Sequence, residues 1–190
     1  MEKKEKLVIG IVGEKGGGKE TVGNILIELL SPKRVIRVRS SDILRETLIQ
    51  WDIPLTRHNQ QHVAIVMNEG FGLGTLSKAV RKRIDVLDAD IVLFDGIRWE
   101  SDAELLHAFT HHKLIYVTAD AKTRYERSVR RNEKADESSV TFQQFMQEEL
   151  ARTETNIPTI GKTADYTIIN EQGPGELKEE IRKIIPTLIG

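Results

Sequence analysis

Short apolar segments recur along the chain and are separated by longer amphipathic ones. The short segments are four to six residues long and rich in β-branched residues, a pattern typical of strands buried in a parallel sheet. The sequence predicts five such strands, at Leu7–Val12, Val35–Arg39, Ile91–Asp95, Leu114–Val117 and Tyr166–Ile169.

The longer segments repeat apolar residues at intervals of three and four, which predicts helices. Because these segments alternate with the strands, we expect an α/β fold of three layers, with a five-stranded parallel sheet between two layers of helices. All 190 residues are expected to form a single domain. The predicted helices lie at 22–30, 43–50, 57–69, 75–87, 101–109, 121–131, from 141 to about 150, and after Gly173.

Two helix starts are expected to be fixed by side chains. Asp42 precedes the helix at 43–50 and fits an N-cap, where its carboxylate would accept backbone N–H groups. Thr141 and Gln144 form a capping-box pattern, in which each side chain bonds the backbone N–H of the other residue. The helix that follows is expected to turn its apolar side chains inward, namely Phe142, Phe145, Met146 and Leu150.

Composition narrows the class of protein. The net charge is −1, which provides no basic surface for nucleic acid. No apolar stretch approaches the roughly 18 residues of a membrane span, and residues 1–6 carry mixed charges without the apolar core of a signal peptide. The absence of cysteine excludes disulfides and thiolate metal sites. We therefore expect a cytoplasmic protein with small-molecule partners and without nucleic-acid or membrane binding.

The segment after the first strand has the spacing G-x-x-x-x-G-K of a phosphate-binding P-loop. Its glycines allow successive backbone N–H groups to surround an anion, and the following helix N-terminus adds partial positive charge. A glutamate follows the lysine, and the hydroxyl comes one position later. The predicted phosphate-binding residues are Gly13, Gly16, Gly17, Gly18, Lys19, Glu20 and Thr21.

A carboxylate and several arginines complete the predicted site. Ligands of open α/β sheets bind beyond the carboxyl ends of the strands, where Asp95 ends the most apolar strand. Asp95 and Thr21 are the expected Mg²⁺ ligands. Guanidinium groups stabilise the negative charge that spreads over a migrating phosphoryl group. We expect Arg45, Arg57 and Arg98 to face the acceptor, and Arg127, Arg131 and Arg152 to close over the donor.

Two segments are sized to cover the site during transfer. No strand is predicted between Asp42 and Ala89, so residues 42–88 form a helical excursion that we expect to bind the acceptor. Residues 132–153 begin with a polar stretch and are expected to form a short lid. For Arg124 and Arg130, on the helix before this lid, a solvated helix face is the favoured interpretation.

These motifs together resemble the nucleoside monophosphate kinases. The P-loop is similar to the adenylate kinase form G-x-x-G-x-G-K-G-T, S-S-D-I-L-R at 40–45 resembles T-G-D-M-L-R, and D-G-I-R at 95–98 resembles D-G-F-P-R. The resemblance implies ATP as donor, Mg²⁺ as cofactor and a (deoxy)nucleoside monophosphate as acceptor. It implies acceptor contacts from Ser40, Arg45 and Arg98, and it places Asp102 where a glutamine reads the acceptor base. Asp42 and Arg57 complete the expected acceptor set.

A second resemblance, to the dephospho-coenzyme A kinases, leaves a different acceptor open. A-D-Y-T-I-I-N at 164–170, followed by G-E-L at 175–177, is similar to their closing segment and implies nucleotide binding by Asn170. Those enzymes phosphorylate an alcohol, which must lose a proton, so Asp42 would then be a general base. A nucleotide phosphate is already anionic and needs no base.

The leading hypothesis is an ATP-dependent kinase of (deoxy)nucleoside monophosphates. The first alternative is phosphoryl transfer to an alcohol, and the second is an ATP-binding regulatory module that transfers nothing. Arginines on both sides of the P-loop favour an enzyme, because a module that only binds ATP has no use for them. The predicted catalytic set is Lys19, Asp42, Arg98, Arg131 and Arg152.

Overall fold

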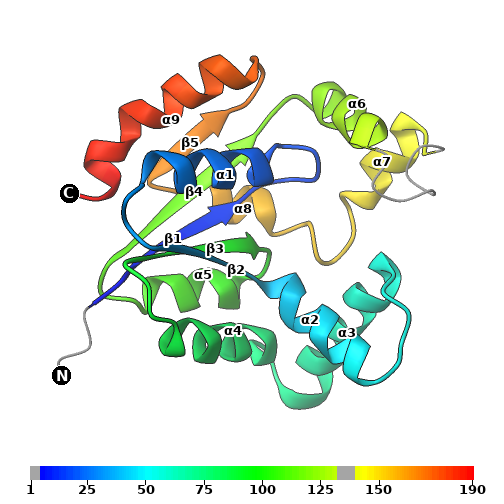
Figure 1. The fold of residues 1–190 in the computed structure, drawn as a ribbon. Coiled ribbons are helices and arrows are strands. Elements are labelled where there is room, and N and C mark those ends of the chain that lie inside the picture. Colours follow the sequence, from blue (N-terminus) through cyan, green and yellow to red (C-terminus); the bar gives the residue numbers. More distant parts are fainter. Residues whose placement is uncertain (1–4, 132–139) are drawn as a thin grey trace.

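A computed structural model describes residues 5–131 and 140–190, and a five-stranded sheet lies at its centre (Figure 1). All strand pairs are parallel, as the sequence predicts, and the structure gives the strand order β2-β3-β1-β4-β5. The third strand is two residues longer than predicted because Ile97 pairs with Val12 after a shift in register. The strands are β1 (Leu7–Val12), β2 (Val35–Arg39), β3 (Ile91–Ile97), β4 (His112–Thr118) and β5 (Tyr166–Ile169).

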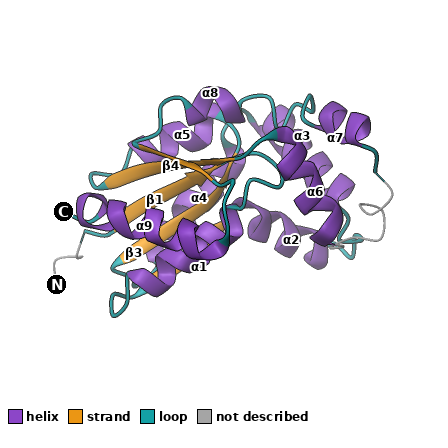
Figure 2. Cartoon of the chain, turned by 90° about the horizontal axis from the view of Figure 1, so that it is seen from above, coloured by secondary structure: helices purple, strands orange, loops and turns teal. Residues whose placement is uncertain are grey.

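Helices cover both faces of the sheet, which confirms the predicted three-layer architecture (Figure 2). On one face, α1 (Lys19–Leu29) packs against α9 (Pro174–Leu188). The other face is covered by α4 (Thr75–Val86), α5 (Glu100–His107) and α8 (Ile157–Gly161). The sequence does not predict α8, because five residues are too few to show a helical period.

Side chains of β1 alternate between the two halves of the core. Ile9 and Ile11 pack in the cluster that includes Leu26 of α1. Val8 packs in the opposite cluster, which includes Leu106 of α5. Because both faces of the strand are buried, its sequence is an unbroken apolar run rather than an alternation of apolar and polar residues.

The helical excursion begins beyond the carboxyl ends of the strands, and its last helix, α4, returns along one face of the sheet (Figure 1). It comprises α2 (Ser40–Gln50), α3 (Arg57–Phe71) and α4, and no strand interrupts it in the described structure. On the opposite side of the P-loop lie α6 (Ala121–Arg131) and α7 (Phe142–Glu148). None of the described helices is both long and apolar enough to span a membrane. The excursion has its own small core, formed by Leu44, Leu48, Val63, Ala64 and Leu76.

The N-cap predicted at Asp42 is wrong. The second strand runs directly into α2, which begins at Ser40, so the N-cap position falls on Arg39 and carries no side-chain cap. Asp42 lies inside the first turn of the helix. Its negative charge there is favourable to the helix dipole without a capping hydrogen bond.

The capping box at Thr141 is confirmed, but the predicted burial of the helix after it is mostly wrong. Gln144 N donates to Thr141 Oγ1 at 3.3 Å, and Thr141 N donates to Gln144 Oε1 at 2.8 Å. Phe145 is 1% exposed, where its ring meets Tyr125 of α6. The seven-residue α7 packs mainly on α6, so its other apolar side chains, Phe142 and Met146, stay exposed, and Leu150 is exposed beyond the end of the helix.

Replacement of Gly10 tests the packing of the central strand. A Cβ at Gly10 would lie 2.5 Å from Leu106 Cδ2 and 2.7 Å from Ile97 Cδ1. Because an overpacked core is strained, Gly10→Ala should lower the free energy of unfolding by about 1–3 kcal/mol, measured by chemical denaturation. Gly175→Ala is the control, since no atom lies within 4 Å of its added Cβ and alanine favours the helix. Equal effects of the two changes would contradict the packing described.

Candidate functional site

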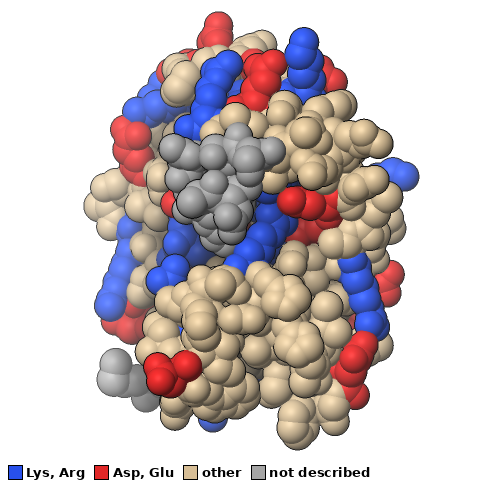
Figure 3. All heavy atoms as spheres, turned by 90° about the vertical axis from the view of Figure 1, so that its right-hand side faces the viewer, with Lys and Arg blue, Asp and Glu red and all other residues tan. Residues whose placement is uncertain are grey.

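A cavity of about 480 Å³ opens beyond the carboxyl ends of the strands, between the P-loop, α2, α3 and the turn after β3. In Figure 3, Lys and Arg side chains gather in a hollow on this side of the molecule. Six cations and three acids line the cavity, and this excess of positive charge suits anionic ligands. The cations are Lys15, Lys19, Arg39, Arg45, Arg57 and Arg98, and the acids are Glu20, Asp95 and Asp102.

The P-loop connects β1 to α1 through positions that require glycine. Gly18 precedes α1 with φ at 100°, a left-handed conformation that side chains disfavour. A Cβ on Gly13 would lie 2.1 Å from the carbonyl oxygen of Val117 in β4. The loop backbone therefore packs directly on the neighbouring strand. Lys19 curls over the loop, and its Nζ donates to the carbonyl oxygens of Gly13 at 2.5 Å and Glu14 at 2.9 Å.

The Lys19 ammonium is held in an unfavourable electrostatic environment. Its pKa is lowered to about 8, chiefly because burial disfavours the charged form, and the positive charge of Arg98 adds to this effect. The carboxylates of Asp95 and Glu154 act in the opposite direction. A phosphate bound in the loop would favour the ammonium and raise its pKa again.

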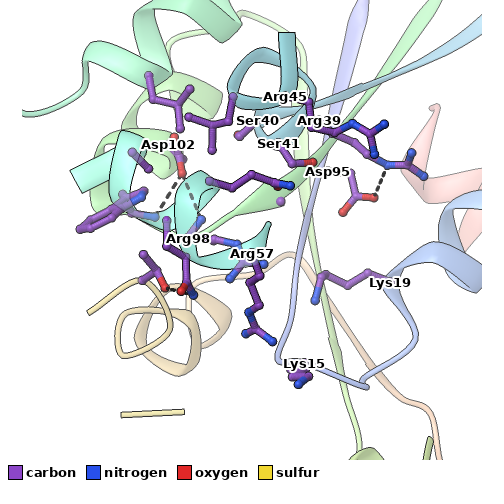
Figure 4. Close-up of a pocket in the computed structure, with 18 of the residues that line it drawn as sticks. Lys15, Lys19, Arg39, Ser40, Ser41, Arg45, Arg57, Asp95, Arg98 and Asp102 are labelled. Atoms are coloured by element: carbon purple, nitrogen blue, oxygen red, sulfur yellow. Dashed lines mark hydrogen bonds and ion pairs between the residues drawn. The ribbon is translucent and has the colours of Figure 1, made fainter. Parts of the chain in front are cut away.

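The two predicted metal ligands lie in different cavities. Asp95 is 7% exposed, lines the large cavity, and has its Oδ2 at 3.6 Å from Arg39 Nε (Figure 4). Thr21 lines a second cavity of about 350 Å³. Among the residues the structure describes, no three His, Asp or Glu side chains form a metal-binding group. Asp95 alone suits Mg²⁺, which takes one or two carboxylates and completes its shell with phosphates and water.

The three arginines predicted to face the acceptor line the same cavity. Arg98 is fixed at both ends, because its backbone N–H donates to Asp102 Oδ2 at 3.0 Å and its guanidinium donates to Glu154 Oε1. Arg57, the first residue of α3, has Nη2 at 3.8 Å from the same glutamate oxygen. Arg45 is exposed on α2, at the rim. They come from α2, α3 and the turn after β3 and surround one volume (Figure 4).

Asp102 borders the cavity, but its carboxylate is engaged within the protein. It is 1% exposed and accepts hydrogen bonds from Ser77 Oγ at 2.6 Å, Arg98 N at 3.0 Å and Trp99 N at 3.1 Å. Burial raises the pKa of Asp102, while these donors act against the shift. The observed role of Asp102 is to hold the start of α5 and the backbone of Arg98.

Ser40 and Asp42 lie two residues apart but face different surroundings. Ser40 lines the cavity, and its hydroxyl oxygen is buried without a hydrogen-bond partner among the described residues. Because buried hydroxyls are normally satisfied, this oxygen is available to a ligand. Asp42 does not line the cavity. Its charge instead acts on Arg83, which pairs with Glu46 outside the cavity.

The second cavity is lined by two of the residues predicted to bind the donor nucleotide outside the P-loop, Arg127 and Asn170. Arg127 Nη1 donates to the carbonyl oxygen of Asn170 at 2.7 Å, and Asn170 Nδ2 donates to the carbonyl oxygen of Gly17 at 2.9 Å. These bonds connect α6, the end of β5 and the P-loop. The lining residues include Gly16, Gly18, Thr21, Arg127, Arg130, Asn170 and Gln172.

Three other arginines differ from their predicted roles or fall outside the description. Arg152 is exposed, does not line either cavity, and bonds Glu69 at 2.6 Å. The side chain of Arg131 and residues 132–139 of the predicted lid lie outside the described residues. The solvated face predicted for Arg124 is wrong, because Arg124 is 7% exposed and pairs with Glu149.

Several cavity residues are absent from the predicted set. Gln60 and Gln61 line the cavity one helical turn after Arg57, and this spacing is the sequence signal that identifies them. Lys15 lies inside the P-loop motif itself. Arg39 ends the second strand, next to the predicted acceptor segment. No local pattern marks Glu154, which does not line the cavity and whose arginine partners are distant in sequence.

The strand order, the P-loop and the helical excursion define the fold of the P-loop kinases. No family model matches the chain. The chain is similar to a protein of Hyperthermus butylicus described as "UPF0200 protein", with 26% identity over 190 residues, covering 100% of this chain and 99% of the relative.

Two solved kinase structures share this fold. One is the shikimate kinase from Acinetobacter baumannii in complex with shikimate, with a TM-score of 0.59, 20% identity and coverage of 97% of this chain and 93% of the other. The other is a gluconokinase from Sinorhizobium meliloti 1021, with a TM-score of 0.58, 15% identity and coverage of 98% and 95%. At these identities the similarity concerns the fold.

The pKa of Lys19 predicts a pH-dependent affinity for ATP. Since bound phosphate favours the ammonium, binding takes up a proton once the pH exceeds about 8. The affinity measured by calorimetry should therefore fall by up to about tenfold per pH unit between roughly pH 8 and 10, and stay level below pH 8 once ATP is fully ionised. Lys19→Met is the matched control and should bind ATP more weakly, without this fall. A parallel fall in both proteins would contradict the assignment.

Proposed function

We propose that this protein is a kinase that transfers the γ-phosphoryl group of ATP to the phosphate of a (deoxy)nucleoside monophosphate. The observation that carries the proposal is the set of arginines that face Lys19 across one cavity, Arg45, Arg57 and Arg98 (Figure 4). Two phosphates that meet in this volume need such charge, both for positioning and for stabilisation of the transition state. A module that only binds ATP needs cations on the donor side alone.

The donor would lie along the P-loop, with its base and ribose in the second cavity. The backbone of residues 13–18 and the Lys19 ammonium hold the β- and γ-phosphates. Arg127 and Asn170 border the space left for the nucleoside. Asp95 would hold Mg²⁺, which neutralises charge on the transferred phosphate.

The acceptor would occupy the large cavity. Its wall combines three apolar side chains, which suit the face of a base, with the carboxamides of Gln60 and Gln61, which can donate and accept hydrogen bonds at the edge of a base. The Ser40 hydroxyl adds a buried polar contact. The three apolar side chains are Leu44, Ala64 and Leu76, and Trp99 lines the cavity as well.

Transfer to an alcohol is the second candidate, and the two similar kinases, named for shikimate and gluconate, favour it. An alcohol acceptor calls for a base near the transferred group. The acidic side chains of the cavity are already engaged, since Glu20 and Asp95 pair with Arg39 and Asp102 accepts three internal hydrogen bonds. A phosphate acceptor, which needs no base, therefore agrees better with the site.

Measurement of ADP formation tests the proposal directly. The assay uses ATP, Mg²⁺ and, as acceptors, the nucleoside monophosphates, dephospho-coenzyme A, shikimate and gluconate. We expect ADP and a nucleoside diphosphate with at least one monophosphate. Lys19→Ala should lower kcat by at least about 100-fold while the protein stays folded, because Lys19 acts on phosphates and not in the core. Turnover with the alcohols alone would support the second candidate.

Asp42 tests the form of the second candidate in which this residue is the general base. With a phosphate acceptor, Asp42→Asn should lower kcat by less than about tenfold, with little dependence on pH, because Asp42 lies outside the cavity. With an alcohol acceptor, loss of the base should lower kcat roughly 10²–10⁴-fold and remove the acidic limb of the pH–rate profile. Glu46→Gln, outside the cavity, controls for the loss of a carboxylate on α2. A large, pH-dependent loss confined to Asp42→Asn would overturn the proposed acceptor.

A further inference from the structure

We propose that Glu154 is a positioning residue that holds Arg57 and Arg98 in the orientation that binds the acceptor phosphate. This inference rests on the proposed function, because it takes the acceptor to be an anion. Glu154 lies in the short connection between α7 and α8 and is 7% exposed. Glutamate is seldom buried to this extent unless it is paired.

The Glu154 carboxylate joins two arginines from separate parts of the fold. Arg98 Nη1 donates to Oε1, and Arg57 Nη2 lies 3.8 Å from the same oxygen. The Thr153 hydroxyl donates to it at 3.3 Å. Since Arg57 begins α3 and Arg98 follows β3, one carboxylate oxygen fixes the helical excursion relative to the sheet.

Glu154 lies behind the arginines and not on the surface of the cavity. Arg57, Arg98 and Thr153 line the cavity, whereas Glu154 does not. A guanidinium carries five N–H groups, so the contact with Glu154 leaves most of them for a phosphate. The carboxylate therefore sets the direction of both guanidinium groups without occupying the position of the phosphate.

The backbone around Glu154 is itself held in place. Its N–H donates to the carbonyl oxygen of Ala151 at 2.7 Å, and its carbonyl oxygen accepts from the N–H of Ile157 at 3.1 Å. Earlier in the same segment, Glu148 contacts Lys15 at 3.1 Å and Arg57 at 3.5 Å. Backbone hydrogen bonds thus fix the turn that carries the Glu154 carboxylate, and the contact between Glu148 and Lys15 connects this segment to the P-loop.

Two roles of Glu154 predict effects of opposite sign. If Glu154 orients the arginines, the isosteric change Glu154→Gln should weaken anion binding, because a neutral amide holds guanidinium groups less firmly. If Glu154 only reduces the positive charge or competes with the anion, its removal should tighten anion binding. The sign of the change therefore identifies the role.

Calorimetric titration with inorganic phosphate measures this sign. The P-loop is first filled with a non-hydrolysable ATP analogue, and loss of phosphate binding in Arg98→Ala identifies the site. We expect the Kd for phosphate to rise about tenfold in Glu154→Gln and to recover in part in Glu154→Asp. Glu46→Gln, which removes the partner of an arginine outside the cavity, should bind like the wild type. Unchanged or tighter binding in Glu154→Gln, or no binding that depends on Arg98, overturns the proposal.

Steady-state kinetics supply the second readout. With an acceptor found in the ADP assay, Glu154→Gln should raise the KM for the acceptor more than the KM for ATP, and denaturation should confirm a folded protein. An equal rise in both values overturns the positioning role. If no nucleoside monophosphate is phosphorylated while phosphate binding still weakens in Glu154→Gln, the proposed acceptor fails and the positioning of the arginines stands.

Discussion

The site depends on one electrostatic constraint: several positive charges are held close together at one edge of the sheet, and their repulsion must be offset. Six cations line one cavity, and like charges at this density repel one another. Carboxylates of a single later segment contact several of them: Glu148 contacts Lys15 and Arg57, and Glu154 pairs with Arg98. Glu149 of the same segment pairs with Arg124, whose guanidinium also contacts the P-loop backbone. The segment from Glu148 to Glu154 is thus in ionic contact with both the P-loop and the wall of the large cavity.

This arrangement also divides the acidic residues between structural and chemical roles. Asp102 binds backbone N–H groups at the start of α5 and the Ser77 hydroxyl of α4, and Glu154 binds guanidinium groups. Asp95 is left at the cavity wall with one oxygen near Arg39. A carboxylate that already pairs with a guanidinium or accepts internal hydrogen bonds is poorly placed to take a proton from an alcohol. The same charges that prepare the site for phosphates therefore make it less suited to deprotonate an alcohol.

Local sequence signals are sufficient to predict the sheet and the P-loop, because a buried strand and a glycine-dependent turn are each encoded by a few consecutive residues. The predictions that fail depend on neighbours in space. Asp42 is not a cap, since β2 continues into α2 without a break. Arg124 is buried because Glu149 and the P-loop backbone surround it. In the sequence Glu154 cannot be distinguished from a solvated glutamate, because its partners Arg57 and Arg98 come close to it only in the folded chain.

Charge alone does not define where an acceptor binds, because Coulomb attraction has no preferred direction. Direction comes from guanidinium groups whose orientation is already fixed before a ligand arrives. Arg98 meets this condition, since Asp102 holds its backbone and Glu154 holds its guanidinium. Arg45 is exposed on α2, and no described side chain holds it in the same way, so it contributes attraction more than geometry. A site that contains both kinds of arginine can draw in an anionic acceptor and then align it with the phosphate on Lys19, which is the geometric requirement of in-line phosphoryl transfer.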